Sequence, residues 1–291
     1  MDLNFLFVNT LNGVVYGALL LLTSLGLSLV FGLGRVVNFA HGALYALGGY
    51  AIVAVMQRTG LGFWLALAIA PIPVMLLAIV IERTTIYPIR DRPEIYTLLV
   101  TFGLSFMLIG AVEYAWGTGT TLVRTPEMFQ GTVQIFGNPF PIFRLTAAAL
   151  SLLASAAVFA FIQFTPFGLR IRAITDDPGM AQALGINTQW LLTIVFGGAA
   201  GLAAFAGALG TPIFAVHPEM GSAILLDAFL AVILGGLGNL PGTAIGALFV
   251  ALTKSIGGGY IADWSIGILF ALVAVALILR PTGLFGQGRV A

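Results

Sequence analysis

The chain has 291 residues, of which 59% are hydrophobic and only 8% are charged, whereas a soluble domain carries about 25% charged residues. Its 12 basic and 11 acidic residues cannot cover the surface of a soluble fold of this length, so the composition excludes an ordinary soluble protein. A net charge of +1 with a single lysine argues against nucleic acid as a partner, and the absence of cysteine excludes disulfides and thiolate metal sites.

Long charge-free runs predict membrane-spanning helices along most of the chain. A helix needs roughly 20 residues to cross a hydrocarbon core of about 30 Å. The runs are apolar at every position rather than at every second one, which excludes the strands of a membrane barrel. The predicted spans are residues 3–34, 36–57, 59–81, 95–112, 145–169, 189–218 and, last, 264–279.

The charge-free run 228–253 is interrupted by the glycine-rich segment GGLGNLPG at residues 235–242. Each half then has only about 13 residues, roughly 20 Å of helix, which is too short for a complete crossing. The sequence therefore predicts a pair of half-helices that meet inside the protein. The whole chain is predicted to be an all-α polytopic membrane protein with about eight transmembrane helices, within a range of about seven to nine.

Basic residues predict the orientation, because cytoplasmic loops carry an excess of Lys and Arg. The segments 82–94 and 168–188, Arg35 and the C-terminal tail together place eight basic residues on the inside. Four are left on the outside, namely Arg58, Arg124, Arg144 and Lys254. This distribution predicts an outside N-terminus, an inside C-terminus and a long outside loop over residues 117–143.

Two interrupted segments are candidates for a translocation pathway. The first is NFAHG at residues 38–42, which places an amide and an imidazole at the start of an apolar span. Either Asn38 caps the helix and His41 forms a local hydrogen bond, or the break exposes polar groups to a pathway. Together with the glycine-rich segment it gives one interrupted element in each half of the chain, the arrangement typical of a transport site. The candidate pathway residues are Asn38, His41, Gly42, Gly235, Gly236, Gly238, Asn239, Pro241 and Gly242.

A short amphipathic helix is predicted in the loop 173–187, outside the membrane. Asp177 suits the N-cap, Pro178 the first turn and Gly185 the position just past the end of a helix of about seven residues. So short a helix is unstable alone and must pack on the protein's own membrane face or on a partner, which is the preferred alternative. The candidate docking residues are Asp176, Asp177, Pro178, Met180, Ala181, Leu184, Gly185 and Ile186.

Enzymatic chemistry is not expected. The chain has two histidines, no HExxH or GxSxG pattern, and no Gly-Lys-Ser or Gly-Lys-Thr for a phosphate-binding loop, so neither a metal nor a cofactor is predicted. Any ATP must be hydrolysed by another subunit. Glu113 and Asp227 lie near predicted span ends and Asp263 lies in a loop, which weakens the alternative of an ion-coupled carrier with a carboxylate in mid-span.

Several segments resemble one known family. They are NFAHG (38–42), LGGY (47–50), ER (82–83), YPIR (87–90), ALGIN (183–187), AVILGGLGNLPG (231–242) and RPTGLFG (280–286). In this order and spacing they resemble the permeases of branched-chain amino-acid ABC importers, the LivH type.

The resemblance implies a single permease domain over residues 1–291 in a bacterial inner membrane. It implies four kinds of neighbour: the lipid bilayer, a second homologous permease subunit, two cytoplasmic ATPase subunits and a periplasmic substrate-binding protein. Residues 168–188 would be the coupling loop that seats on an ATPase. The expected solutes are branched-chain or other hydrophobic amino acids. Permeases of urea and short amides share the motifs and form the alternative, and a self-sufficient channel or secondary carrier is a further one.

Overall fold

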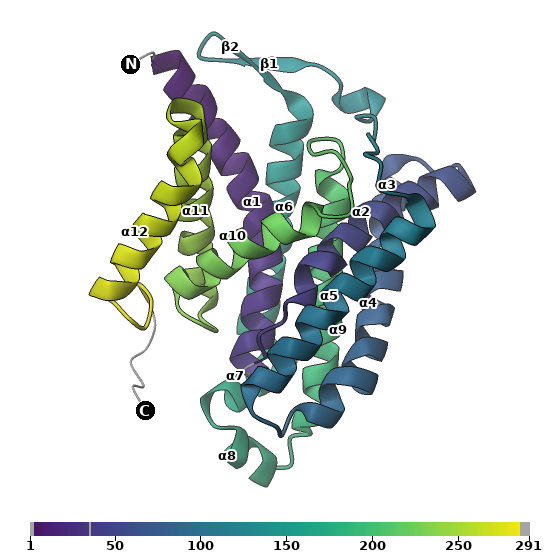
Figure 1. Ribbon diagram of the computed structural model, residues 1–291, viewed down its shortest axis with the longest axis vertical. Coiled ribbons are helices and arrows are strands. Elements are labelled where there is room, and N and C mark those ends of the chain that lie inside the picture. The colour runs from purple at the N-terminus through teal and green to yellow at the C-terminus, as the bar shows by residue number, and fades with distance from the viewer. Residues whose placement is uncertain (1–2, 35, 286–291) are drawn as a thin grey trace.

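The computed structural model describes residues 3–34 and 36–285, and it is a bundle of helices (Figure 1). Arg35 and Arg289, which contribute to the predicted orientation, and Gly286, the last residue of the RPTGLFG segment, lie outside the described residues. The helices are α1 (Leu3–Gly34), α2 (Ala40–Thr59), α3 (Phe63–Ile69), α4 (Pro71–Ile81), α5 (Glu94–Trp116), α6 (Ile142–Phe164), α7 (Pro166–Asp176), α8 (Pro178–Ala183), α9 (Thr188–Gly210), α10 (Met220–Gly235), α11 (Leu240–Tyr260) and α12 (Ser265–Leu279).

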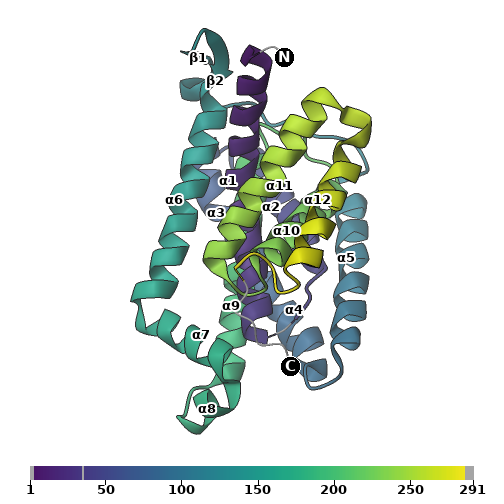
Figure 2. The same ribbon diagram turned by 90° about the vertical axis from the view of Figure 1, so that its left-hand side faces the viewer.

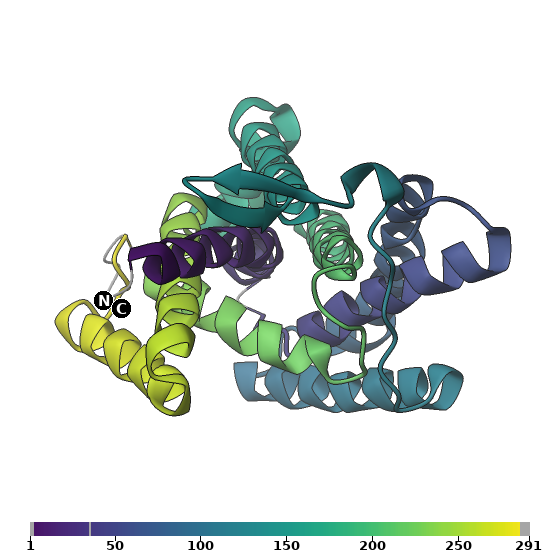
Figure 3. The ribbon, with the colours of Figure 1, turned by 90° about the horizontal axis from the view of Figure 1, so that it is seen from above.

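Helix α1 is the central element of the bundle. It packs against α6, α9, α10 and α11, and the view from above shows α1 and α9 between α6 on one side and α10 on the other (Figure 3). Most of its side chains from Val15 to Leu33 are buried. Because helices surround this part of α1 on several sides, its apolar residues form protein core instead of facing lipid.

Six helical segments of the described chain are long and apolar enough to cross a membrane. They are α1, the segment Phe63–Ile89 that contains α3 and α4, and α5, α6, α9 and α11; two shorter apolar helices are α10 and α12. The chain is thus an α-helical polytopic protein, as predicted. The number of complete crossings stays a prediction.

Proline and glycine divide two of the predicted spans. The predicted span 59–81 begins late, because Gly60 ends α2 with φ of +69°. Pro71 then divides the rest of the span, since it begins α4 directly after α3. The predicted span 145–169 ends early, at Phe164, because Thr165 caps α7 and Pro166 occupies its first turn.

The prediction of two half-helices around the glycine-rich segment is wrong in its lengths. The break is present: Gly236 and Gly238 have φ of +101° and +79°, and the Asn239 side chain accepts a hydrogen bond from the Gly242 amide at 2.8 Å to begin α11. However, α10 has 16 residues and α11 has 21, so α11 is long enough to cross. Both helices extend past the charged residues that bounded the predicted run, since those residues pair inside the bundle.

The two ends of the bundle differ in structure. The start of α1 and a hairpin of β1 (Thr132–Ile135) and β2 (Asn138–Pro141) lie at one end, and α8 lies at the other (Figures 1 and 2). The hairpin is a small strand element that the sequence did not predict. The N-terminus and the loop 117–143 share one end, the arrangement that the orientation requires. Which end faces the outside stays a prediction.

Candidate functional site

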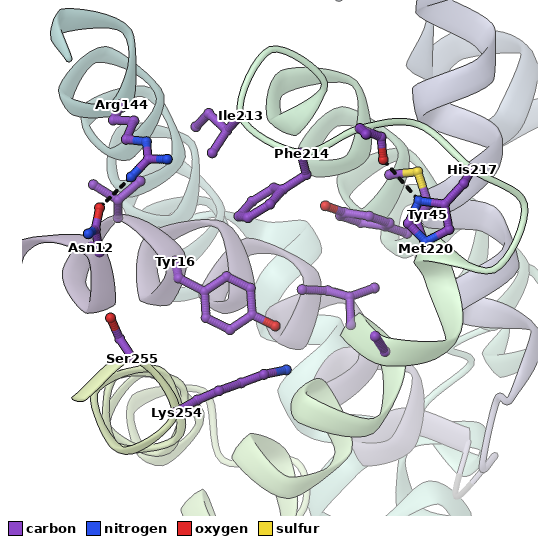
Figure 4. A pocket seen from close by; sticks show the side chains of 14 residues that line it. Asn12, Tyr16, Tyr45, Arg144, Ile213, Phe214, His217, Met220, Lys254 and Ser255 are labelled. Carbon is purple, nitrogen blue, oxygen red and sulfur yellow. Dashed lines mark hydrogen bonds between the residues drawn. The ribbon is translucent and has the colours of Figure 1, made fainter. Parts of the chain in front are cut away.

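Two cavities lie toward opposite ends of α1. The hairpin-side cavity, of about 400 Å³, is lined by Val15 and Tyr16 of α1, by Arg144 near the hairpin, and by residues of α2, α10 and α11 (Figure 4). The α7-side cavity, of about 540 Å³, is lined by Ser28 and Gly32 of α1, by α6 and α7, and by residues 237–241. Tyr16 and Ser28 are twelve residues apart, about 18 Å along the helix. The intervening Leu19, Leu22 and Leu25 are fully buried, so packed side chains separate the two cavities.

An ion pair with a buried carboxylate lies beside the hairpin-side cavity. Lys254 Nζ is 2.5 Å from Asp227 Oδ2, and the Tyr16 hydroxyl donates to the same oxygen. The Asp227 side chain is 4% exposed and that of Lys254 35% exposed. The lysine also lies over the Tyr16 ring, 5.4 Å from its centroid. This cluster joins the central helix α1 to α10 and α11, the two helices that flank the glycine-rich break.

These positions correct the sequence analysis. Asp227 lies in the middle of α10 instead of near a span end, and Lys254 lies within α11 instead of in an outside loop. Asp227 and Lys254 each interrupt an otherwise charge-free run. An ionisable residue inside a membrane helix is costly unless it is paired, so such a residue is a candidate functional residue and a partner is expected. That signal, one acid and one base on the two helices that flank the break, could have identified the pair.

A second polar pair also lines this cavity. The guanidinium of Arg144 donates to Asn12 Oδ1 at 2.5 Å, which links the first turn of α6 to α1 (Figure 4). Arg144 forms no ion pair within the described part of the chain. The sequence analysis counted Arg144 only as an outside charge, because its neighbour Asn12 is far away in the sequence.

The glycine-rich break lines the α7-side cavity. Gly238, Asn239 and Pro241 are among its wall residues, together with Asp176 from the predicted docking segment. Gly32 of α1 packs against Gly238: a Cβ on Gly32 would lie 3.0 Å from the Gly238 Cα. Here the residues predicted for translocation and for docking meet at one cavity.

The residues 38–42 line neither cavity. Asn38 is buried and its Oδ1 accepts from the Ala40 amide at 3.0 Å, which forms a turn just before α2; the N-cap position itself is Phe39, without a side-chain cap. His41 Nε2 is 3.0 Å from the Thr23 carbonyl oxygen of α1, and its buried Nδ1 has no partner among the described residues. Gly42 packs against Gly221, where a Cβ on either would overlap the other's carbonyl oxygen. This segment therefore joins α2 to α1 and α10, and its role in translocation stays a prediction.

The two interrupted segments contact opposite ends of α10. Gly42 meets α10 at Gly221, whereas the break begins at Gly235, where a Cβ would overlap the Gly242 carbonyl group. Fourteen residues separate Gly221 from Gly235, about 21 Å of helix. The structure thus places the segments at the two ends of one short helix instead of at a single site.

The predicted amphipathic helix is present as α8. Asp177 Oδ1 accepts from the Met180 amide at 2.9 Å, Pro178 occupies the first turn, and Gly185 has φ of +82° just past the end. Ala181 is buried against α7 and α9, while Met180 and Leu184 are 59% and 74% exposed. The helix therefore packs on its own protein through Ala181 and also exposes an apolar face.

Directly after α8, the start of α9 is tied to the α4–α5 connection. Glu82, predicted in a loop, is fully buried at the start of a π-helical turn (Glu82–Ile86), and its Oε2 accepts from Thr193 Oγ1 at 2.8 Å. The Tyr87 hydroxyl donates to Gln189 Oε1 at 2.8 Å. Sequence reasoning missed this link because its two sides are about a hundred residues apart.

A bundle of membrane-length helices, with a cavity toward each end and packed side chains between them, is the architecture of a membrane transport protein. Among the residues that the structure describes, no group of three or more His, Cys, Asp or Glu side chains could hold a metal ion.

Comparison with known proteins defines the class more closely. Residues 9–279 match the family described as "Branched-chain amino acid transport system / permease component". The chain is 30% identical to the high-affinity branched-chain amino acid transport system permease protein LivH of Salmonella typhimurium, over 96% of this chain and 95% of that protein. It is 28% identical to BraD of Pseudomonas aeruginosa over the same shares, and 26% identical to LivM of Escherichia coli over 92% of this chain and 68% of LivM. No solved structure matches the chain significantly. The chain belongs to this family of branched-chain amino acid transport permeases.

Proposed function

We propose that the chain is the membrane-spanning permease subunit of an ATP-driven importer for branched-chain or other hydrophobic amino acids. Family membership over residues 9–279 is the observation that carries this proposal. Relatives named as high-affinity branched-chain amino acid permeases support the solute class. The chain itself acts as one permease domain over residues 1–291 and contributes the pathway, not the ATPase.

The two cavities support an alternating-access pathway. In this structure each cavity is separated from the other by the buried middle of α1, so solute cannot pass directly. Rearrangement of α1, α10 and α11 connects the hairpin-side cavity to the α7-side cavity during transport. The residues Gly238, Asn239 and Pro241 line the exit side, and the segment 38–42 holds α2 against α10 while these helices move.

The energy comes from partner subunits that dock on α8. Two cytoplasmic ATPase subunits are proposed, one of which contacts the exposed Met180 and Leu184. Asp176, Asp177, Pro178, Gly185 and Ile186 shape the segment, and Ala181 fixes it to α7 and α9. Motion of the ATPase therefore reaches α9 and, through Thr193, the α4–α5 connection.

A second permease and a solute-binding protein complete the proposed importer. Similarity to proteins named LivH and to one named LivM supports a pair of homologous permeases, of which this chain is one. The binding protein delivers solute at the hairpin end, which faces the periplasm if the charge distribution sets the orientation in a bacterial inner membrane.

Uptake by the assembled transporter tests the function. The chain, a second permease, the two ATPases and the binding protein are reconstituted in liposomes, and radiolabelled leucine, urea and acetamide are offered in turn. We expect ATP-dependent accumulation of leucine and none of urea or acetamide. Leucine transport by the chain alone without ATP would instead establish a channel or carrier. Uptake restricted to urea or acetamide would show that the chain is a permease for urea or short amides.

A further inference from the structure

The hairpin-side cavity carries one uncompensated positive charge. Of the described residues that line it, none is Asp or Glu, and the two cations are Arg144 and Lys254. Lys254 is neutralised by Asp227, whereas Arg144 has Asn12 as its partner and no carboxylate. A guanidinium has five N–H donors in a planar fork that matches a carboxylate, and only part of that fork is used here. The cavity therefore has one end suited to an anion.

The rest of the wall is largely apolar and has the size of a small-molecule site. Ile213, Phe214, Met220 and Ile224 line it (Figure 4), and its volume of about 400 Å³ lies within the range of roughly 300–1,000 Å³ typical of ligand pockets. Tyr45 also lines it: this residue is 3% exposed, its hydroxyl has no hydrogen-bond partner among the described residues, and Figure 4 shows that hydroxyl directed toward Phe214. A buried hydroxyl that faces a cavity is ordinarily satisfied by a ligand or by water.

We propose that this cavity binds an aliphatic α-amino acid as its zwitterion before translocation. Arg144 holds the α-carboxylate, and the Asn12 amide oxygen, which has a second lone pair beyond the one given to Arg144, accepts from the neighbouring ammonium group. The aliphatic side chain lies against Phe214, Met220 and Ile224. The inference rests on the proposed function and adds to it a site inside the permease that recognises the solute independently of the binding protein.

The absence of cysteine provides a direct assay. Ala223 lies on the cavity wall and is exposed. We place Ala223→Cys in the assembled transporter, with cysteine-free partners and without binding protein. The rate at which this cysteine reacts with N-ethylmaleimide then reports whether the cavity is occupied. We expect leucine to slow this reaction. Met128→Cys, in the exposed loop at the same end, is the matched control and should be unaffected by leucine. Ser255→Cys, also on the wall, repeats the measurement if Ala223→Cys does not assemble.

Analogues and second substitutions assign the contacts. 4-Methylpentanoate, which keeps the carboxylate, should protect the cysteine, and leucinamide, which lacks it, should not. Arg144→Gln should raise the leucine concentration for half-maximal protection about 10- to 100-fold, with partial recovery in Arg144→Lys. Asn12→Leu should weaken protection by leucine but not by 4-methylpentanoate.

The outcomes separate this site from the function on which it rests. Unchanged labelling of the wall cysteine by saturating leucine, in a transporter that still imports leucine with ATP, overturns the site and leaves the function intact. Equal protection by leucine and leucinamide also overturns it. Absence of ATP-dependent amino-acid uptake in every assembled variant, whatever the labelling shows, overturns the function.

Discussion

The ammonium group of Lys254 on α11 lies 2.5 Å from a carboxylate oxygen of Asp227 on α10, across the glycine-rich break that joins the two helices. Tyr16 of α1 donates to the same oxygen, so one carboxylate links three helices. Because the Asp227 side chain is buried, loss of either partner leaves its carboxylate incompletely satisfied.

Removal of the lysine alone should destabilise the protein more than removal of both charges. Lys254→Met leaves the buried carboxylate with Tyr16 as its one remaining donor, and we expect a loss of about 3 kcal/mol in the free energy of unfolding. The double variant Lys254→Met, Asp227→Leu should recover most of this loss. Unfolding of the purified protein in detergent measures both. Arg124→Met, an exposed cation at the hairpin end, is the control and should change stability by less than about 0.5 kcal/mol. A double variant as unstable as the single one would show that the pair itself stabilises the fold.

Charge on the exposed face of α8 should uncouple the ATPases. Met180→Glu with Leu184→Glu places two carboxylates where we propose an apolar contact, so ATPase co-purification and ATP-dependent leucine uptake should fall by at least about tenfold. The permease itself should remain folded, because both side chains are exposed. Met128→Glu, an equally apolar and exposed position at the opposite end, should leave both measurements unchanged. Normal uptake by the α8 variant would exclude this face as the docking site.

Substitution of Gly42 should disrupt the contact between α2 and α10. In Gly42→Ala the new methyl group overlaps the Gly221 carbonyl oxygen and lies 2.8 Å from the Leu225 Cβ, so we expect a cost of about 3 kcal/mol or more from backbone displacement. Folded yield after detergent extraction measures it. Gly110→Ala in α5 is the matched control, since a Cβ there meets no atom within 4 Å. Equal yields for the two variants would contradict the close crossing.

Loss of the Thr193 hydroxyl should destabilise the link between α9 and the α4–α5 connection. Thr193→Val removes the hydroxyl that donates to the buried Glu82 carboxylate and leaves Arg83, whose Nε lies 3.8 Å from the same oxygen, so we expect a cost of about 1–3 kcal/mol. Glu82→Gln should lower this cost in the double variant, because a neutral amide is less costly to bury. Thr146→Val in α6, whose hydroxyl donates within its own helix to the Ile142 carbonyl, is the control in the same thermal measurement. A Thr193→Val protein as stable as wild type would show that the ion pair with Arg83 compensates the Glu82 carboxylate without the hydroxyl.

Much of the helical organisation could be predicted from hydropathy. The first predicted span, residues 3–34, coincides with α1, and the turn chemistry of Asp177, Pro178 and Gly185 located α8 correctly, because caps and breakers act locally. The predicted lengths of the two helices beside the glycine-rich break were wrong for a physical reason. Charged residues were treated as boundaries of apolar runs, whereas Asp227 and Lys254 neutralise each other and so lie inside helices.

The cavities could not be predicted, because each combines residues from distant parts of the chain. Arg144 and Asn12 are 132 positions apart, and Glu82 and Thr193 are 111 apart. Hydropathy describes single segments, and a single sequence does not show which faces of separate helices meet. The pathway residues at 235–242 were selected on composition, and part of that segment does line a cavity; the segment 38–42 was selected on the same grounds and packs between helices instead.

One helix forms a wall of both cavities, and this has a mechanical consequence. Helix α1 contains no proline over its 32 residues, and its middle is held on all sides by packed neighbours. Proline is a main cause of sharp bends in helices, so we expect a displacement of one part of α1 to carry the neighbouring turns with it. Any displacement of α1 therefore changes a wall of each cavity, so the two compartments are tied to each other through a single helix.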